Sequence, residues 1–330
     1  MIPGEMHPEL GNPQPGAPLR ARLAGLARLG DPLFYGLTLA AAASIMVVAG
    51  WLVYELFANS AQARHEFGWK FLVSKDWDPV AGQFGALPFI FGTIATSAAA
   101  LLMAAPLGVG TAIFLAELAP RRLSSLLAFL VDLLAAVPSV IYGLLGIFLL
   151  VPFLSSTVVP AIQGVAGSLP IFSGRFYGVS VFSASVVLVV MVVPFIVSIS
   201  REVLLSVPVE QREASFALGS THWETVWKVV LPNARRGIYA SIFLALARAL
   251  GETMAVTMVI GNTPQISKSL FAPGYTISAV IANEFTEATD NLYLSALIEL
   301  ALVLFAITFI INGLARLAIL ATTRRHETHV

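Results

Sequence analysis

The stretch FYGVSVFSASVVLVVMVVPFIVSIS, residues 176–200, contains no Asp, Glu, Lys or Arg. A helix needs roughly 20 apolar residues to cross the hydrocarbon core of a bilayer, and this stretch exceeds that length. The rest of the chain has the same character, since 57% of its 330 residues are hydrophobic and 12% are charged, with a mean hydropathy of +0.84. A typical soluble domain carries about 25% charged residues. The composition therefore excludes a soluble protein and indicates an integral membrane protein.

The charged and reactive residues exclude several classes of function. The 19 basic residues balance the 19 acidic ones, so a nucleic acid is not an expected partner. The absence of Cys excludes disulfides, iron–sulfur ligation and thiol catalysis. The His residues lack the spacing of a metal site, and we expect no metal and no cofactor. No Lys follows a Gly, so the G-K-[ST] phosphate-binding loop is missing, and we expect no enzyme and no ATPase site in this chain.

Six stretches are apolar and long enough to cross a membrane, where lipid permits only helices or closed barrels. We therefore expect an all-α protein with six transmembrane helices, at residues 32–54, 79–116, 123–154, 176–200, 238–262 and 292–314. Residues 155–170 are rich in Ser, Gly and Pro and are expected to form an external loop. Pro106, Pro138 and Pro194 are expected to bend their helices.

The basic residues set the predicted orientation. When the N-terminus is placed inside the cell, most Arg and Lys residues outside the helices lie on the cytoplasmic side, as the positive-inside rule requires. Both ends are then cytoplasmic, in a multi-pass protein of the cytoplasmic (inner) membrane. Residues 1–31 are rich in Pro and Gly and are expected to form a disordered cytoplasmic tail, and residues 32–86 the first helix with an external segment.

Between the fourth and fifth predicted helices, residues 208–236 carry the signals of two short cytoplasmic helices. Acidic residues open the first, and Gly219 can adopt the left-handed backbone that ends it. Thr221 and Glu224 have the spacing of a capping box at the start of the second, which Pro232 is expected to stop. The segment therefore predicts a helix–Gly–helix hairpin on the cytoplasmic side.

The second helix of this hairpin places Trp223 and Trp227 one turn apart on one face. Two interpretations fit this spacing. The helix could lie on the lipid interface, where Trp is common, or it could bind a cytoplasmic partner through aromatic anchors. The spacing alone leaves both open.

The same segment resembles the EAA loop of ABC-transporter membrane subunits, which reads E-A-A, three residues, G, nine residues, I-x-L-P. The matching residues, with Ser and Val replacing the second Ala and the Ile, are Glu213, Ala214, Ser215, Gly219, Val229, Leu231 and Pro232. In that family the loop forms a coupling helix that sits in a groove of the ATPase subunit. The resemblance implies that a separate ATPase binds here, with coupling assigned to Glu213, Ala214, Gly219, Trp223, Trp227, Leu231 and Pro232.

Other motifs resemble the phosphate-specific importer within that family. They are ARALGETMAVT at 247–257, FAPGYTI at 271–277, IANEF at 281–285, LAELAP at 115–120 and AVPSVIYG at 136–143. The resemblance covers roughly residues 85–320 and implies a transporter domain at residues 87–322, followed by a cytoplasmic tail at 323–330. The two sister permeases of that importer share R-A-L-G-E, and the continuation M-A-V-T favours one of them.

The resemblance implies a six-helix permease of the type I ABC importer fold that translocates inorganic phosphate. It further implies a complex with the sister permease, two copies of an ATPase and an external phosphate-binding protein. A permease for another oxyanion, or the sister subunit itself, is the alternative. A secondary transporter would need no coupling loop, and a signalling role is compatible with transport.

Two charged residues in the fifth predicted helix, Arg248 and Glu252, are four residues apart and are expected to share one helix face. An Arg at membrane depth costs about 2.5–3.5 kcal/mol on insertion scales, so we expect it to have a partner, and Glu252 is the nearest candidate. One interpretation is a structural ion pair that helps to join two permease subunits. The other makes Arg248 a transient phosphate site on the translocation pathway, with Glu252 keeping the binding weak.

Three further acidic residues lie in or near the predicted helices. Asp132 and Glu299 are expected either to pair with polar groups across the bundle or to line the pathway. Glu117 lies near the end of the second helix, where Arg121 or Arg122 is expected to neutralise it.

Overall fold

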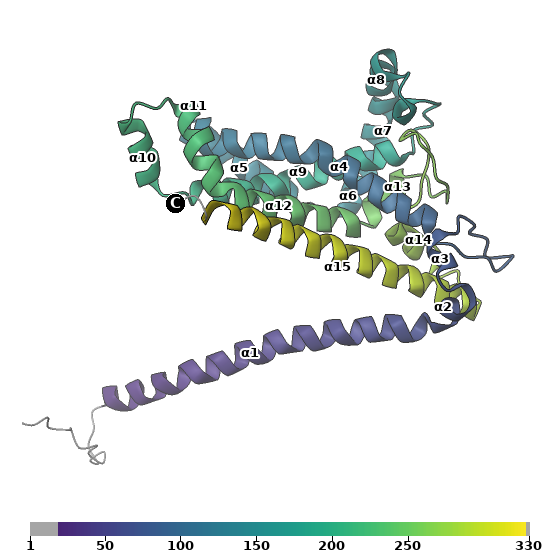
Figure 1. Cartoon of the computed structure of the whole chain (residues 1–330), viewed down its shortest axis with the longest axis horizontal. Coiled ribbons are helices and arrows are strands. Elements are labelled where there is room, and N and C mark those ends of the chain that lie inside the picture. Colours follow the sequence, from purple (N-terminus) through teal and green to yellow (C-terminus); the bar gives the residue numbers. More distant parts are fainter. Residues whose placement is uncertain (1–18, 328–330) are drawn as a thin grey trace, which may run out of the picture. The chain divides into compact units, whose positions relative to one another are not determined.

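The computed structural model describes residues 19–327, with side chains described for residues 32–317. This part of the chain consists of helices and loops, and its extended backbone pairs only in an isolated bridge between Asp78 and Gln83. The chain divides into two compact units, Met1–Glu55 and Leu56–Val330 (Figure 1). All of the candidate site residues belong to the second unit.

The first unit contains most of helix α1, Leu19–Asn59, whose part from Pro32 to Asn59 is long and apolar enough to span a membrane. The helix starts well before residue 32, because residues 19–31 are rich in Leu, Ala and Arg, which favour helix. The disordered tail predicted for residues 1–31 is therefore wrong for residues 19–31. Residues 1–18 lie outside the described residues.

The second unit is a bundle built around α9, which is apolar on all sides and packs against three other long helices (Figure 1). These helices are α9, Val181–Leu205; α4, Leu87–Ile113; α5, Arg121–Ala135; and α12, Leu231–Gly251. Close contact between α4 and α9 depends on a glycine, because a Cβ on Gly108 would lie 2.7 Å from the Ile196 side chain. The core of the unit therefore lies along α9.

Length and apolarity identify five candidate membrane spans in the described chain. They are Pro32–Asn59, Leu87–Leu118, Ser139–Ala166, Val181–Leu205 and Asn291–Leu317. The first, second, fourth and sixth predicted helices are found near their expected positions, whereas the third and fifth differ. The count of six and the cytoplasmic position of both ends remain predictions.

The third predicted helix, residues 123–154, is divided by a break. Helix α5 ends at Ala135, and α6, Ser139–Leu145, begins directly after Pro138. Proline has no N–H to donate and disfavours helical backbone at the residue before it. The bend predicted at Pro138 is therefore a complete interruption.

From α6 the chain stays helical through α7, Val151–Phe153, and α8, Val159–Ala166, so the loop predicted for residues 155–170 is wrong up to Ala166.

Each π-helical turn in the described chain ends two residues before a proline. The pairs are Phe114–Leu118 with Pro120, Gly146–Leu150 with Pro152, Leu154–Val158 with Pro160, and Val226–Val230 with Pro232. A proline ring clashes with the carbonyl four residues before it, and the wider π turn relieves that clash. At the last three of these prolines the helix continues.

The fifth predicted helix, residues 238–262, is also interrupted. Helix α12 ends before Glu252, whose backbone is extended (φ −68°, ψ 127°), and the short α13, Met254–Val259, follows. Helix α13 packs against α6, and Gly143 permits the approach, because a Cβ there would lie 2.4 Å from the Met258 sulfur. The two interrupted helices therefore meet inside the bundle.

Opposite ends of the bundle carry different short helices (Figure 1). One end holds α10, Val209–Ala217, and α11, His222–Thr225; the other holds α2, Ala61–Phe67, α3, Lys70–Val73, α14, Ile277–Glu284, and the start of α15, Asn291–Glu327. At the second end the Glu284 carboxylate accepts hydrogen bonds from the Trp77 indole at 2.8 Å and the Tyr293 hydroxyl at 2.6 Å. The loop that carries Trp77 is thereby fixed to α14 and α15.

Candidate functional site

The segment 208–236 contains the predicted hairpin. Gly219 follows α10 with a φ of +84°, in the left-handed region that glycine adopts without strain. Helix α11 starts with a capping box: the Glu224 N–H donates to the Thr221 hydroxyl at 3.3 Å, and the Thr221 N–H donates to the Glu224 carboxylate at 3.0 Å. The Thr221 N–H and hydroxyl, which both donate to the Glu224 carboxylate, together with the nearby Lys228, lower the pKa of Glu224 to about 2. The predicted turn and cap are both confirmed.

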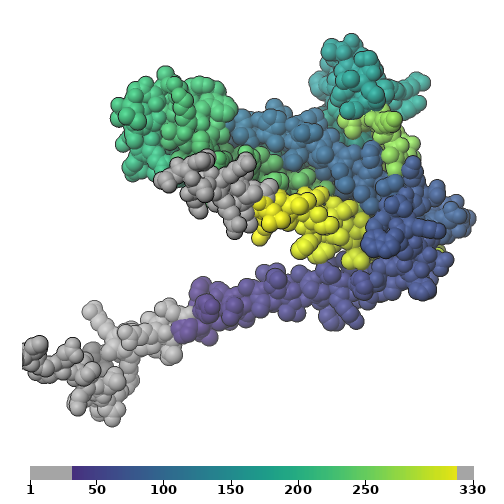
Figure 2. Space-filling view, viewed as in Figure 1, coloured from purple at the N-terminus to yellow at the C-terminus, as the bar shows by residue number. Residues whose placement is uncertain are grey.

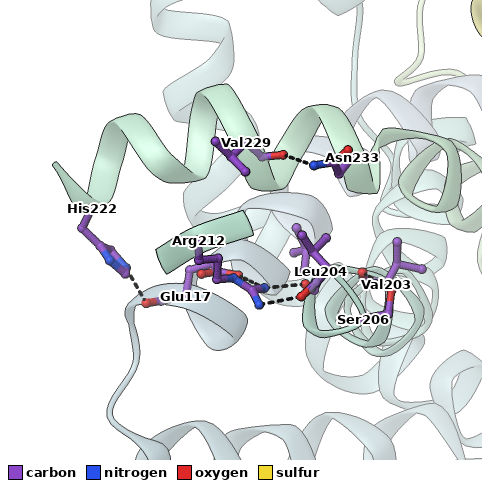
Figure 3. Close-up of polar contacts among 9 residues, drawn as sticks. Glu117, Val203, Leu204, Ser206, Arg212, His222, Val229 and Asn233 are labelled. Carbon is purple, nitrogen blue, oxygen red and sulfur yellow. Dashed lines mark hydrogen bonds and ion pairs between the residues drawn. The ribbon is translucent and has the colours of Figure 1, made fainter. Parts of the chain in front are cut away.

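Pro232 does not stop the second helix, and that prediction is wrong. It lies in the first turn of α12, directly after the π turn Val226–Val230, where the missing N–H of proline is tolerated. The side-chain amide of Asn233 donates to the Val229 carbonyl at 3.0 Å (Figure 3). The hairpin therefore runs without a break into α12, a long helix of the bundle.

Arg212 of α10 fixes the hairpin to the ends of two long helices. Its Nη2 lies 2.8 Å from Oε1 of Glu117, just beyond α4, and the two side chains are 15% and 6% exposed. The guanidinium also donates to the carbonyls of Leu204 at 2.8 Å and Val207 at 2.7 Å, at the end of α9 (Figure 3). One buried cation thus joins α10 to α4 and α9.

The prediction that Arg121 or Arg122 neutralises Glu117 is wrong, because Arg212 does so from a position 95 residues further along the chain. His222 adds a second contact, with its Nε2 2.8 Å from the Glu117 carbonyl oxygen (Figure 3). Sequence spacing offered no signal for either contact. They depend on the folding of the bundle.

The departure from the EAA pattern at Ser215 has a structural explanation. Its buried hydroxyl lies 3.0 Å from that of Thr225 and joins α10 to α11, a bond that Ala could not make. The Phe216 ring also stacks on the His222 ring, with centroids 5.9 Å apart. The hairpin is therefore held together internally as well as at its base.

The outer surface of the hairpin carries large exposed apolar side chains among charged ones. Trp223 and Trp227 are 58% and 54% exposed, with ring centroids 5.5 Å apart, and Leu218 is 88% exposed. Figure 2 shows this green region projecting from the end of the second unit. The other predicted coupling residues divide into exposed Glu213, Ala214, Gly219 and Pro232, and partly buried Leu231, which packs on the Ala112–Leu204 cluster. Exposed aromatic side chains on a rigid support are typical of a binding surface.

Arg248 lies on an exposed face of α12, with its guanidinium carbon 5.8 Å from the centroid of the Phe195 ring of α9. Glu252 does not share its helix face, because α12 has ended; the Glu252 carboxylate instead accepts the Ala255 N–H at 3.2 Å. The described side chains therefore hold no Arg248–Glu252 ion pair, and the expected face sharing is wrong.

Asp132 of α5 and Ser198 of α9 form a second polar group in the bundle. The Ser198 hydroxyl donates to Oδ1 of Asp132 at 2.5 Å, which joins α9 to α5, and Asp132 is exposed. Ser198 follows Phe195 by about one helical turn, so Arg248 and Asp132 contact the same face of α9. The bundle thus presents a cation and a carboxylate on one face.

Glu299 has a different setting. It is 6% exposed, and its Oε2 has no hydrogen-bond partner in the described part of the chain. Ala296 and Val303, on the same face of α15, belong to or pack on an apolar cluster. Glu299 therefore lies in the packed interior, away from the open face with Arg248.

The guanidinium of Arg248 is a group that can bind an oxyanion. A guanidinium stays charged at any working pH and donates two parallel hydrogen bonds to an oxyanion. No ion pair neutralises Arg248 among the described side chains. A protonated phosphate also carries a hydroxyl, which can donate a hydrogen bond to a carboxylate such as that of Asp132.

Comparisons with known proteins identify the family. Residues 108–320 match the family described as binding-protein-dependent transport system inner membrane component. The chain is 50% identical over 292 residues to the phosphate transport system permease protein PstC of Mesorhizobium japonicum, covering 87% of this chain and 89% of the relative. It is 42% identical to PstC of Haemophilus influenzae, with coverage of 88% and 93%.

Solved structures support the same fold. A bacterial ABC transporter involved in the import of alginate aligns with a TM-score of 0.53 at 17% identity, covering 88% of this chain and 98% of the other. The transporter in complex with its pentasaccharide-bound periplasmic protein aligns with a TM-score of 0.54 at 16% identity, with coverage of 86% and 93%. These identities show the fold alone. The sequence relatives and the family match show that the chain belongs to the PstC family of phosphate transport system permeases, multi-pass proteins of the inner membrane.

Proposed function

We propose that this permease works in a complex with a PstA-like permease, two copies of a PstB-like ATPase and an external PstS-like phosphate-binding protein. The observation that carries the proposal is the hairpin, which presents Trp223 and Trp227 to solvent and continues into α12. Closure of the ATPase would push on this surface. The Arg212–Glu117 ion pair would pass the movement to α4 and α9.

Within this complex, phosphate passes the face that carries Arg248. The guanidinium binds the anion transiently, and Asp132 accepts a hydrogen bond from its protonated oxygen. Glu252 acts on the pathway through the break between α12 and α13, since its carboxylate caps the start of α13. Glu299 serves the packing of α15.

The proposed topology has six crossings with both ends in the cytoplasm. Two crossings use interrupted helices, α5 with α6 and α12 with α13, which meet at Gly143 and Met258. Interrupted helices that line a cavity are common at transporter binding sites. The transporter domain then comprises residues 87–322, the first crossing with its external segment residues 32–86, and the cytoplasmic tail residues 323–330.

The test is uptake of labelled phosphate at micromolar concentration by a host that lacks its own permease gene. Wild type should restore uptake and retain the ATPase on purification. Gly219→Pro should abolish both, because proline cannot adopt the φ of +84°. Restored uptake of sulfate or molybdate but not phosphate would contradict the substrate. Normal uptake by Gly219→Pro would contradict the coupling role of the hairpin.

A further inference from the structure

A cavity of about 820 Å³ lies at the end of the second unit that carries α2, α3 and α14. It opens between α4, the loop of residues 263–274 and the short segment at Pro170 and Ile171. Apolar side chains form most of its wall, and Lys75, Gln265 and Lys268 are its longest polar side chains. The hairpin lies at the opposite end of the bundle (Figure 1).

The wall of the cavity follows α4 towards the middle of the helix. Lining residues run from Phe91 to Leu102, a distance of roughly 16 Å along a helix with a rise of about 1.5 Å per residue. Small side chains, including Ala95 and Ala99, leave the space open. The cavity is too large and too apolar for an inorganic oxyanion, but it has the shape and lining for an acyl chain.

The two lysines are carried by loops that hydrogen bonds hold in place. In the loop with Lys268, the Ser269 hydroxyl donates to the Ser173 carbonyl at 2.6 Å, and the Leu270 N–H donates to the Ile171 carbonyl at 2.9 Å. The loop with Lys75 is fixed at Trp77 to Glu284. Both ammonium groups are therefore presented by fixed backbone at one cavity.

No acidic side chain lines the cavity beside these lysines. The residues that line the cavity include no Asp or Glu, and neither Lys75 nor Lys268 forms an ion pair with another described side chain. An apolar cavity lined by two lysines that form no ion pair is complementary to an amphiphile with an anionic head group.

We propose that this cavity binds an anionic phospholipid from the leaflet opposite the hairpin. The phosphate of the head group lies between Lys75 and Lys268, and an acyl chain lies along α4 past Ala95 and Ala99. Bound in this way, the lipid joins the loop before α4 to the loop after α13. The proposal does not depend on the roles of Arg248 or the hairpin.

The test uses the purified whole complex and native mass spectrometry with added phosphatidylglycerol or phosphatidylcholine. Wild type should retain phosphatidylglycerol preferentially. Each basic side chain near an anionic lipid contributes roughly fivefold in affinity, so the double variant Lys75→Gln/Lys268→Gln should bind about 25-fold more weakly. Lys70→Gln removes a nearby charge outside the cavity and should have no effect. Ala99→Phe should weaken both lipids by filling the cavity.

Equal retention of phosphatidylglycerol by wild type and the double lysine variant would overturn the proposal. So would displacement of the lipid by millimolar inorganic phosphate, because the occupant would then be the free anion. If an amine-directed reagent labels neither lysine in the delipidated complex, a protein segment covers the cavity, and the proposal fails.

Discussion

The hairpin at residues 208–236 and the face around Arg248 differ in whether their polar groups have bonding partners within the chain. In the hairpin, the cap, the Ser215–Thr225 hydrogen bond and the Arg212–Glu117 ion pair give each of these polar groups a partner within the chain. On the membrane face, Arg248 has only an aromatic ring beneath it. The hairpin is therefore held by contacts within the chain, whereas Arg248 forms no ion pair with another described side chain.

This difference fits the two tasks of a permease. A surface that transmits force must be rigid before its partner arrives, so its polar contacts are made internally. In the proposed pathway, a site that binds an anion transiently must keep a cation available, although an unpaired Arg at membrane depth is costly. Four substitutions test this difference between the hairpin and the Arg248 face.

The largest effect is expected from Arg212→Met. Removing one member of a buried ion pair costs about 3–5 kcal/mol, because Glu117 is left with an uncompensated charge. The hairpin should become protease-sensitive, and phosphate uptake should fall. The double variant Arg212→Met/Glu117→Gln should recover much of the lost stability in thermal unfolding. A double variant as unstable as the single one would argue against the ion pair as the anchor.

Arg248→Gln should lower phosphate uptake about 100-fold, since a charged hydrogen bond contributes roughly 1.5–3 kcal/mol. Assembly and resistance of the hairpin to protease should be unchanged, in contrast to Arg212→Met. Arg248→Lys keeps the charge but not the paired donors, and should retain part of the uptake. Normal uptake by Arg248→Gln would remove this residue from the pathway.

Trp223→Ala should weaken binding of the ATPase by about 30-fold, the typical loss for an aromatic anchor of about 2 kcal/mol. The measurement is titration of the reconstituted permease with the ATPase subunit. Trp69→Ala provides the matched control, because Trp69 is 86% exposed and lies outside the hairpin. Equal affinities for wild type and Trp223→Ala would indicate that the tryptophans face lipid instead.

The smallest effect is expected from the cap. Thr221→Ala should destabilise α11 by about 1 kcal/mol, measured by hydrogen exchange of its first amides.

The contribution of Glu224 to the stability of α11 should depend on pH. Because the folded-state pKa of Glu224 is lowered to about 2, this contribution is fully present above the unfolded pKa of about 4.3 and is lost as the pH falls towards 2. Exchange in wild type and Glu224→Gln should therefore differ constantly from pH 8 to about 5 and converge below that range. A difference that already shrinks near pH 6 would refute this assignment.

Predictions made from neighbouring residues were confirmed where the structure depends on interactions between neighbouring residues. Gly219 and the Thr221–Glu224 cap depend on backbone sterics and on hydrogen bonds across three residues, so they could be predicted in detail. The rule that a proline stops a helix failed at Pro232, where a π turn directly before α12 relieves the clash.

The sequence by itself determined the membrane class, most of the long helices, the hairpin and the resemblance to phosphate importers. These features depend on apolar stretches, caps and motifs whose residues lie close together along the chain. Only the tertiary structure decided that Arg212 rather than Arg121 binds Glu117, that Glu252 leaves the face of Arg248, and that Asp132 meets Ser198. These pairings join residues up to 95 positions apart or depend on where a helix is interrupted. Charge and hydrogen bonding act over a few ångströms in space, and spacing along the chain does not reveal which groups folding brings within that distance.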